Sequence, residues 1–184
     1  MRKITLDSLM PTRIDRSMHR LSSPLCANVM LIDSQPVFLN ILAAGFDKRG
    51  FKNIVTASAV GEAIAKMHGQ QPDLVVVGLD AEDQLGVQAL AAIRKDAALR
   101  LTPVLVITTA AQVSYAKVSF HLSEDAVFSK PIDMGRLIDV AVDRICDRNL
   151  RDSISATVRR SRAIPASDKY RRLRKIVGRS EPMS

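Results

Sequence analysis

The chain has 184 residues, of which 47% are hydrophobic and 4% aromatic, and a formal net charge of +8. This size is typical of one ordinary domain with tails, and the hydrophobic share suffices for a core of aliphatic side chains. No run approaches the roughly 18 apolar residues of a membrane span, and no secretory signal opens the chain, so we expect a cytoplasmic protein. The two cysteines lack metal-ligand spacing, and we expect both to be free thiols.

The charge divides the chain into three parts. Residues 1–27 carry a net charge of +3, residues 28–147 a net charge of −3, and residues 148–184 a net charge of +8. We therefore expect a slightly acidic folded body at 28–147 between a basic, partly disordered N-terminal extension and a basic C-terminal extension.

Strand-like and helix-like patterns alternate five times along the body. The predicted strands are short apolar runs, and the predicted helices carry apolar residues at three- and four-residue spacing. Strands that are apolar on both faces, joined to helices by short loops, predict an α/β fold with a doubly wound parallel sheet. In chain order the elements are a strand at 28–33, a helix at 36–49 ended by Gly50, a strand at 53–57, a helix at 58–69 with Ser58 as cap and Gly69 as end, a strand at 73–78, a helix at 86–99, a strand at 104–109, a helix at 110–122, a strand at 125–130 and a helix at 133–149.

The carboxyl ends of the predicted strands are the first place to look for a functional site. In doubly wound sheets, ligands and reacting groups gather at that edge. The residues there are Asp33 after the first strand, Gly78 after the third, Thr108 after the fourth and Lys130 after the fifth. An acid, a hydroxyl and a lysine are thus expected at one edge of the sheet.

Four motifs in register carry a resemblance to a known family. The order and spacing of LIDSQP, PDLVVVG followed by LG, PVLVITTA and VFSKP resemble the receiver domain of bacterial two-component response regulators, over residues 28–147. The resemblance implies a flavodoxin-like sheet of order 2-1-3-4-5 and a cis peptide at Lys130–Pro131. It also implies a role in phosphorelay signal transduction, with a histidine kinase, a phosphotransfer protein or another regulator as partner.

The resemblance also assigns a site. In the family, an aspartate at the tip of the third strand accepts a phosphoryl group, and it holds magnesium together with two acids after the first strand. A hydroxyl and a lysine contact the phosphoryl oxygens. By position, Asp33 and Ser34 fall on the two acids, Thr108 on the hydroxyl, Lys130 on the lysine and Gly78 on the phosphoacceptor.

This departure at the phosphoacceptor changes the expected chemistry. Glycine offers no carboxylate nucleophile. Magnesium prefers oxygen ligands, and of the three carboxylates that hold it in the family only Asp33 is present here. Gly86 keeps its family distance, so no gap moves another acid into place. We predict a degenerate receiver (a pseudo-receiver) that is not an enzyme, binds magnesium weakly or not at all, and acts by protein–protein contact without phosphorylation.

Alternative interpretations stay open for single residues. Asp80 is an alternative phosphoacceptor, but in an extended chain it lies about 6–7 Å beyond Gly78, which favours a solvated loop acid. Asp33 and Lys130 are alternatively an ion pair across the strand ends, and Thr108 a structural hydroxyl.

The basic C-terminal extension is a candidate contact surface. It is predicted to continue the last helix as far as Ser161, to break at Pro165 and to form a short amphipathic helix at 167–178. Alternatives are a disordered tail, a partner-docking helix, an acidic membrane surface, or weak nucleic-acid binding with the body as a homodimerisation module. The candidate contact residues are Tyr170, Arg171, Arg172, Leu173, Arg174, Lys175 and Ile176.

Overall fold

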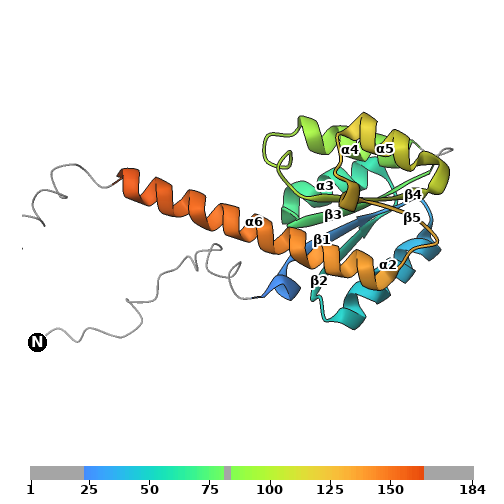
Figure 1. The fold of residues 1–184 in the computed structure, drawn as a ribbon, viewed down its shortest axis with the longest axis horizontal. Coiled ribbons are helices and arrows are strands. Elements are labelled where there is room, and N and C mark those ends of the chain that lie inside the picture. Colours follow the sequence, from blue (N-terminus) through green and yellow to red (C-terminus); the bar gives the residue numbers. More distant parts are fainter. Residues whose placement is uncertain (1–22, 81–83, 164–184) are drawn as a thin grey trace, which may run out of the picture. The chain divides into compact units, whose positions relative to one another are not determined.

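The computed structural model describes residues 23–80 and 84–163, and these contain a five-stranded parallel sheet (Figure 1). Its strand order is β2-β1-β3-β4-β5, so the predicted doubly wound fold is confirmed. The prediction that residues 167–178 form a helix lies outside the described residues. The strands are β1 (Asn28–Ile32), β2 (Asn53–Ala57), β3 (Leu74–Leu79), β4 (Val104–Thr109) and β5 (Val127–Lys130).

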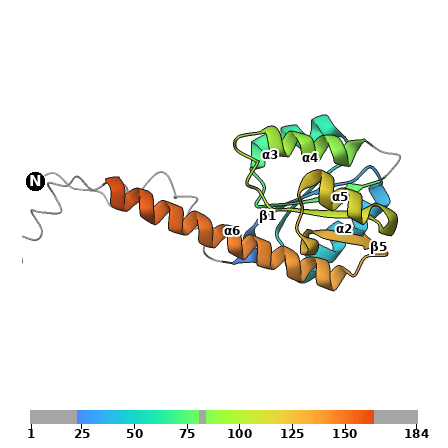
Figure 2. The same cartoon turned by 45° about the horizontal axis from the view of Figure 1, so that its top comes forward.

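Helices cover both faces of the sheet, as a parallel sheet requires. One face packs against α2 and the first turns of α6, and the other against α3, α4 and α5 (Figures 1 and 2). The chain divides after Asn149 into two units, and α6 runs through this boundary. The helices are α2 (Pro36–Arg49), α3 (Val60–Gln70), α4 (Leu85–Lys95), α5 (Val113–Phe120) and α6 (Met134–Ala163), with 3-10 turns at η2 (Pro24–Cys26), η3 (Ala110–Gln112) and η4 (Glu124–Ala126).

The alternation of side chains along each strand builds the two halves of the core. In β1, Leu31 packs into the cluster under α2 and α6, whereas Ile32 packs into the cluster under α3, α4 and α5. In β3, Val76 and Val77 divide between the same two clusters. β3 is the central strand, and all six of its residues are buried because helices cover both of its faces. The packing around β3 therefore holds the residues at its end in place.

The predicted start and end of α3 and the predicted end of α4 were wrong for local reasons. α3 begins after Ala59 rather than Ser58, and the Ser58 amide donates to the Glu62 carboxylate at 3.0 Å. α3 also runs past Gly69, because the left-handed residue that ends it is Gln71 (φ 47°). α4 stops at Lys95 rather than residue 99 because the Asp96 carboxylate accepts the next free backbone N–H groups and turns the chain.

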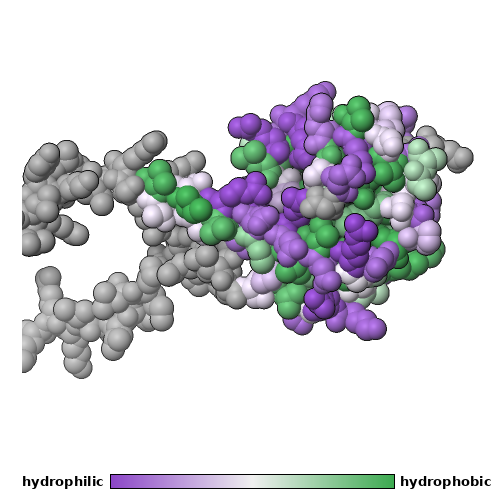
Figure 3. All heavy atoms as spheres, viewed as in Figure 1, coloured by the Kyte–Doolittle hydropathy of each residue, from purple (hydrophilic) through white to green (hydrophobic). Residues whose placement is uncertain are grey.

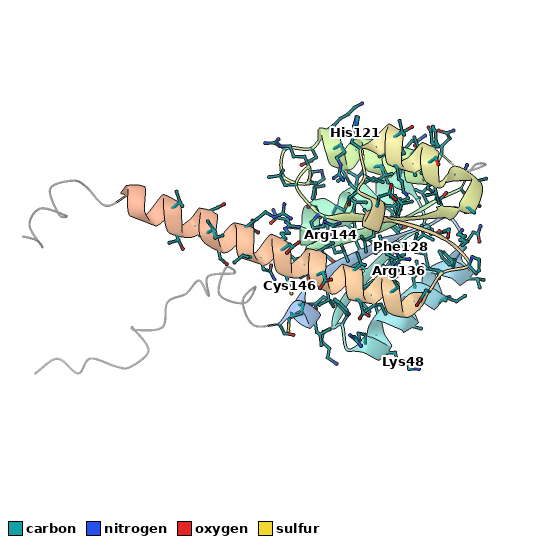
Figure 4. All side chains as sticks on the ribbon, viewed as in Figure 1. Lys48, His121, Phe128, Arg136, Arg144 and Cys146 are labelled. Atoms are coloured by element: carbon teal, nitrogen blue, oxygen red, sulfur yellow. The ribbon has the colours of Figure 1, made fainter. Side chains whose placement is uncertain are left out.

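α6 is fixed to the body by three arginines up to the unit boundary. The Arg136 guanidinium lies 5.9 Å from the Phe128 ring centroid, and Arg144 donates to the Ser123 hydroxyl at 3.0 Å (Figure 4). Arg148 donates to the carbonyls of residues 72 and 73 at 2.8 and 3.1 Å, at the start of β3. Among the described helices, α6 included, none has the length and hydropathy that crossing a membrane requires.

Candidate functional site

Four of the sequence-predicted site residues lie at one edge of the sheet. Asp33 directly follows β1, and Gly78 is the penultimate residue of β3. The parallel register pairs Leu79 with Thr108, and Thr109 with Lys130, so the ends of β3, β4 and β5 are level. The tertiary structure thus confirms that strand order brings these positions together at the carboxyl edge.

The side chain of Asp33 fills the space beside Gly78. A Cβ atom placed on Gly78 would lie 1.8 Å from Asp33 Oδ2 and 2.7 Å from its Cγ, far inside van der Waals contact. Asp33 is only 1% exposed, and its Oδ1 accepts the Gln35 backbone N–H at 2.8 Å. The acid after β1 therefore occupies the volume that any side chain at position 78 would need.

Gly86, in the first turn of α4, lies directly against the backbone at the end of β3. A Cβ atom on Gly86 would lie 2.2 Å from the Gly78 carbonyl oxygen, so α4 begins directly against the end of β3. Only a residue without a side chain allows this approach. The glycine that keeps its family distance in the sequence is therefore required by backbone packing beside the site.

Asp80 faces Lys130, which corrects the expectation of a solvated loop acid. The Lys130 ammonium lies 3.1 Å from Asp80 Oδ1 and 3.3 Å from Oδ2, and the Gln35 amide donates to Oδ2 at 3.2 Å. The two charged side chains are only 25% and 21% exposed. Asp80, which directly follows β3, therefore lies at the site beside Lys130, so an estimate from an extended chain was wrong. The cation at Lys130 thus contacts Asp80, a partner that the sequence pattern did not suggest for it, since the alternative there was an ion pair with Asp33.

The Lys130 ammonium has an aromatic neighbour as well. It lies 4.6 Å from the centroid of the Phe38 ring, within the range of a cation–π contact. The peptide bond from Lys130 to Pro131 is cis, as the resemblance implied. Phe38 belongs to the first turn of α2, so β5 and α2 together position this lysine.

Thr108 has the contacts of a structural hydroxyl. Its Oγ1 is fully buried and donates to the Leu79 carbonyl at 2.7 Å, across the β3–β4 pair. The same oxygen lies 2.9 Å from Gln112 Oε1. This arrangement agrees with the alternative that treats Thr108 as a strand-end hydroxyl holding the edge of the sheet together.

The residues present do not fit a magnesium site of the kind the resemblance implies. Ser34 is exposed and contributes a hydroxyl where the family has a carboxylate, and Gly78 contributes no side chain. The carboxylate of Asp80 is already paired with Lys130. Within residues 23–80 and 84–163, no three His, Cys, Asp or Glu side chains gather as a metal site would need.

Sequence reasoning missed Gln35 and Phe38. Gln35 directly precedes α2 and its side-chain amide donates to Asp80, whereas Phe38 lies in the first turn of α2 and its ring contacts Lys130. The available signal was their position immediately after the strand-end acid, at the edge where function gathers.

Other sequence candidates lie elsewhere. The contact residues proposed in the C-terminal extension, Tyr170 to Ile176, lie outside the described residues. A hollow of about 850 Å³ lies at the opposite, amino edge of the sheet. It does not include any residue of the carboxyl-edge site, and its lining includes Cys26, Asn28, Lys52, Asn53, Asp73 and Asn149.

Comparisons with known proteins agree with this fold. Residues 29–142 match the family described as response regulator receiver domain. Protein PilH of Pseudomonas aeruginosa is 25% identical over 112 residues, which cover 61% of this chain and 92% of PilH.

Solved structures show the same fold at lower sequence identity. The chemotaxis response regulator CheY4 of Vibrio cholerae is 19% identical, with a TM-score of 0.56 over 65% of this chain and 98% of CheY4. The signal receiver domain of a putative Luxo repressor protein from Vibrio parahaemolyticus is also 19% identical, with a TM-score of 0.61 over 70% of this chain and 97% of that domain. Since the family match spans well over half of the sequence, the chain belongs to the response regulator receiver domain family, the receivers of two-component signalling.

Proposed function

We propose that this receiver transmits its signal by protein–protein contact, without accepting a phosphoryl group. The single observation that carries the proposal is the Asp33 carboxylate in the space beside Gly78, 1.8 Å from where a Cβ would stand. An acyl phosphate forms only on a carboxylate, and the residue at this position has none. The partners are other two-component proteins: a histidine kinase, a phosphotransfer protein or a second regulator.

The pairing of Lys130 supports the same proposal. In a phosphorylated receiver the lysine contacts the phosphoryl oxygens, as the resemblance implies. Here the ammonium lies 3.1 Å from Asp80, so an incoming anion would have to displace an internal carboxylate. Asp80 thus offers Lys130 an internal carboxylate partner in place of a phosphoryl group.

A phosphorylation assay tests the proposal. The purified full chain is incubated with acetyl phosphate and Mg²⁺, and the intact mass is measured, with an active receiver as positive control. We expect no added phosphoryl mass. Beryllofluoride with Mg²⁺, which mimics an acyl phosphate, is expected to leave the backbone amide NMR signals of residues 33, 78 and 130 in place. A stoichiometric mass increase, or shifts centred on these residues, would disprove the proposal.

A second candidate function is favoured by one specific observation. Because Asp80 contacts Lys130 rather than solvent, its carboxylate lies within the site, and an alternative is that Asp80 itself accepts the phosphoryl group. Asp80→Asn separates the two candidates. A label that is present in the wild type and lost in Asp80→Asn would establish Asp80 as the acceptor. The hypothesis of nucleic-acid binding through the basic extensions stays a prediction, because those segments lie outside the described residues.

A further inference from the structure

The C-terminal part of α6 carries a row of exposed aliphatic side chains. Leu150 is 61% exposed, Ile154 55% and Val158 43%. At four-residue spacing these three lie within an arc of about 80° and span about 12 Å along the helix. Figure 3 shows hydrophobic side chains at the surface of this part of α6. We call Leu150, Ile154 and Val158 the α6 row.

The helix around the α6 row is basic. Between residues 150 and 163 the sequence has four arginines and one aspartate, a net charge of +3. The charged residues are Arg151, Asp152, Arg159, Arg160 and Arg162. An apolar row within a positive segment complements a surface that is apolar at its centre and negative at its rim.

The geometry of the row favours a protein surface over a bilayer. Side chains at four-residue spacing form the ridge that packs into the groove of another helix, commonly at a crossing angle of about 50°. Helices that lie on membranes carry a broader apolar face, with Trp, Phe or Leu. The α6 row has three aliphatic side chains and no aromatic one.

The chain's own segments and a second copy match the row less well. Residues 1–27 carry a net charge of +3 and residues 164–184 a net charge of +4, so both repel a basic helix. A second copy would bring two segments of charge +3 together.

We propose that the α6 row docks on an acidic protein partner, through an apolar helix or groove flanked by Asp and Glu. Leu150 and Ile154 are the anchors, and Arg151 contributes charge complementarity beside them. The docking surface lies in the second unit, 150–184, and it operates whether or not the carboxyl-edge site takes a phosphoryl group.

Site-specific photocrosslinking in the cells that make the protein tests this proposal. The full chain carries a benzophenone amino acid at position 154, and a control chain carries it at position 155. Ser155 is also exposed, but its side chain points about 100° around the helix from that of Ile154. We expect adducts from position 154 with a protein segment of net negative charge, at about tenfold higher yield than from position 155. Leu150→Ser and Arg151→Glu should each lower the yield several-fold.

Leu101→Ser is the matched control, because Leu101 is 77% exposed and lies outside the row. It should leave the yield unchanged. Adducts with lipid, nucleic acid or a second copy of the chain, equal yields at the two positions, or no adduct at all would overturn the proposal. So would binding of the purified chain to anionic vesicles or duplex DNA that Leu150→Ser abolishes. None of these readouts depends on phosphorylation, so this proposal and the proposed function fail separately.

Discussion

Replacing Gly78 by alanine measures how tightly Asp33 fills the site. The added Cβ would lie 1.8 Å from Asp33 Oδ2, 2.7 Å from Cγ and 3.3 Å from Cβ, so the aspartate side chain must rotate. Rotation breaks the 2.8 Å hydrogen bond that the Gln35 backbone N–H donates to the buried Asp33 carboxylate, which costs about 1.5–3 kcal/mol. Replacing glycine by alanine returns about 0.4–1 kcal/mol by restricting the unfolded chain. We therefore expect a net loss of about 0.5–2.6 kcal/mol in the free energy of unfolding.

Gly61→Ala is the matched control, because a Cβ there meets nothing within 4 Å inside α3. The same substitution should stabilise the protein by about 0.4–1 kcal/mol, since only the unfolded-state and helix-propensity effects remain. Urea denaturation followed by far-UV circular dichroism gives both values. If Gly78→Ala proved as stable as Gly61→Ala, Asp33 would not fill the position, and the argument for the proposed function would fail with it.

Three further predictions concern ion pairs and hydrogen bonds. Lys130→Met should lower the free energy of unfolding by about 0.5–1.5 kcal/mol, because the largely buried Asp80 carboxylate loses its cation. A double-mutant cycle with Asp80→Asn, measured by urea denaturation, should show a coupling free energy of the same size. Arg148→Ala should cost about 1–3 kcal/mol in urea denaturation, because two carbonyls at the start of β3 lose their donor, and an unchanged midpoint would contradict this. The hydrogen bond from Lys66 holds the pKa of Glu62 below its usual 4.5, so Lys66→Ala should raise that pKa in a carboxyl NMR titration. Because the folded-state pKa is lowered, this contact stabilises the protein above about pH 4.5 and its contribution fades as the pH falls, a decline that should be shallower in Lys66→Ala.

Local sequence patterns determined most of the fold. β2 and β4 have the predicted bounds, and Gly50, with φ 104°, ends α2 as its lack of a side chain suggests. The bounds of these strands and the end of this helix depend on apolar periodicity and on backbone conformational freedom, and both are determined by residues close together in the sequence. The boundaries of α3 and α4 were missed because a single carboxylate, Glu62 or Asp96, captured backbone N–H groups that the pattern did not assign.

By itself the sequence placed Asp33, Gly78, Thr108 and Lys130 at one edge, because parallel strands of a doubly wound sheet all end there. Only the tertiary structure decided how these side chains pair. The Asp33 side chain fills the space beside Gly78, and the Lys130 ammonium contacts the Asp80 carboxylate. The physical reason is that local periodicity predicts where each strand ends, and parallel strands end at one edge of the sheet whatever their order. A side chain's partner depends instead on which nearby volume is left empty and where the backbone brings the next charge.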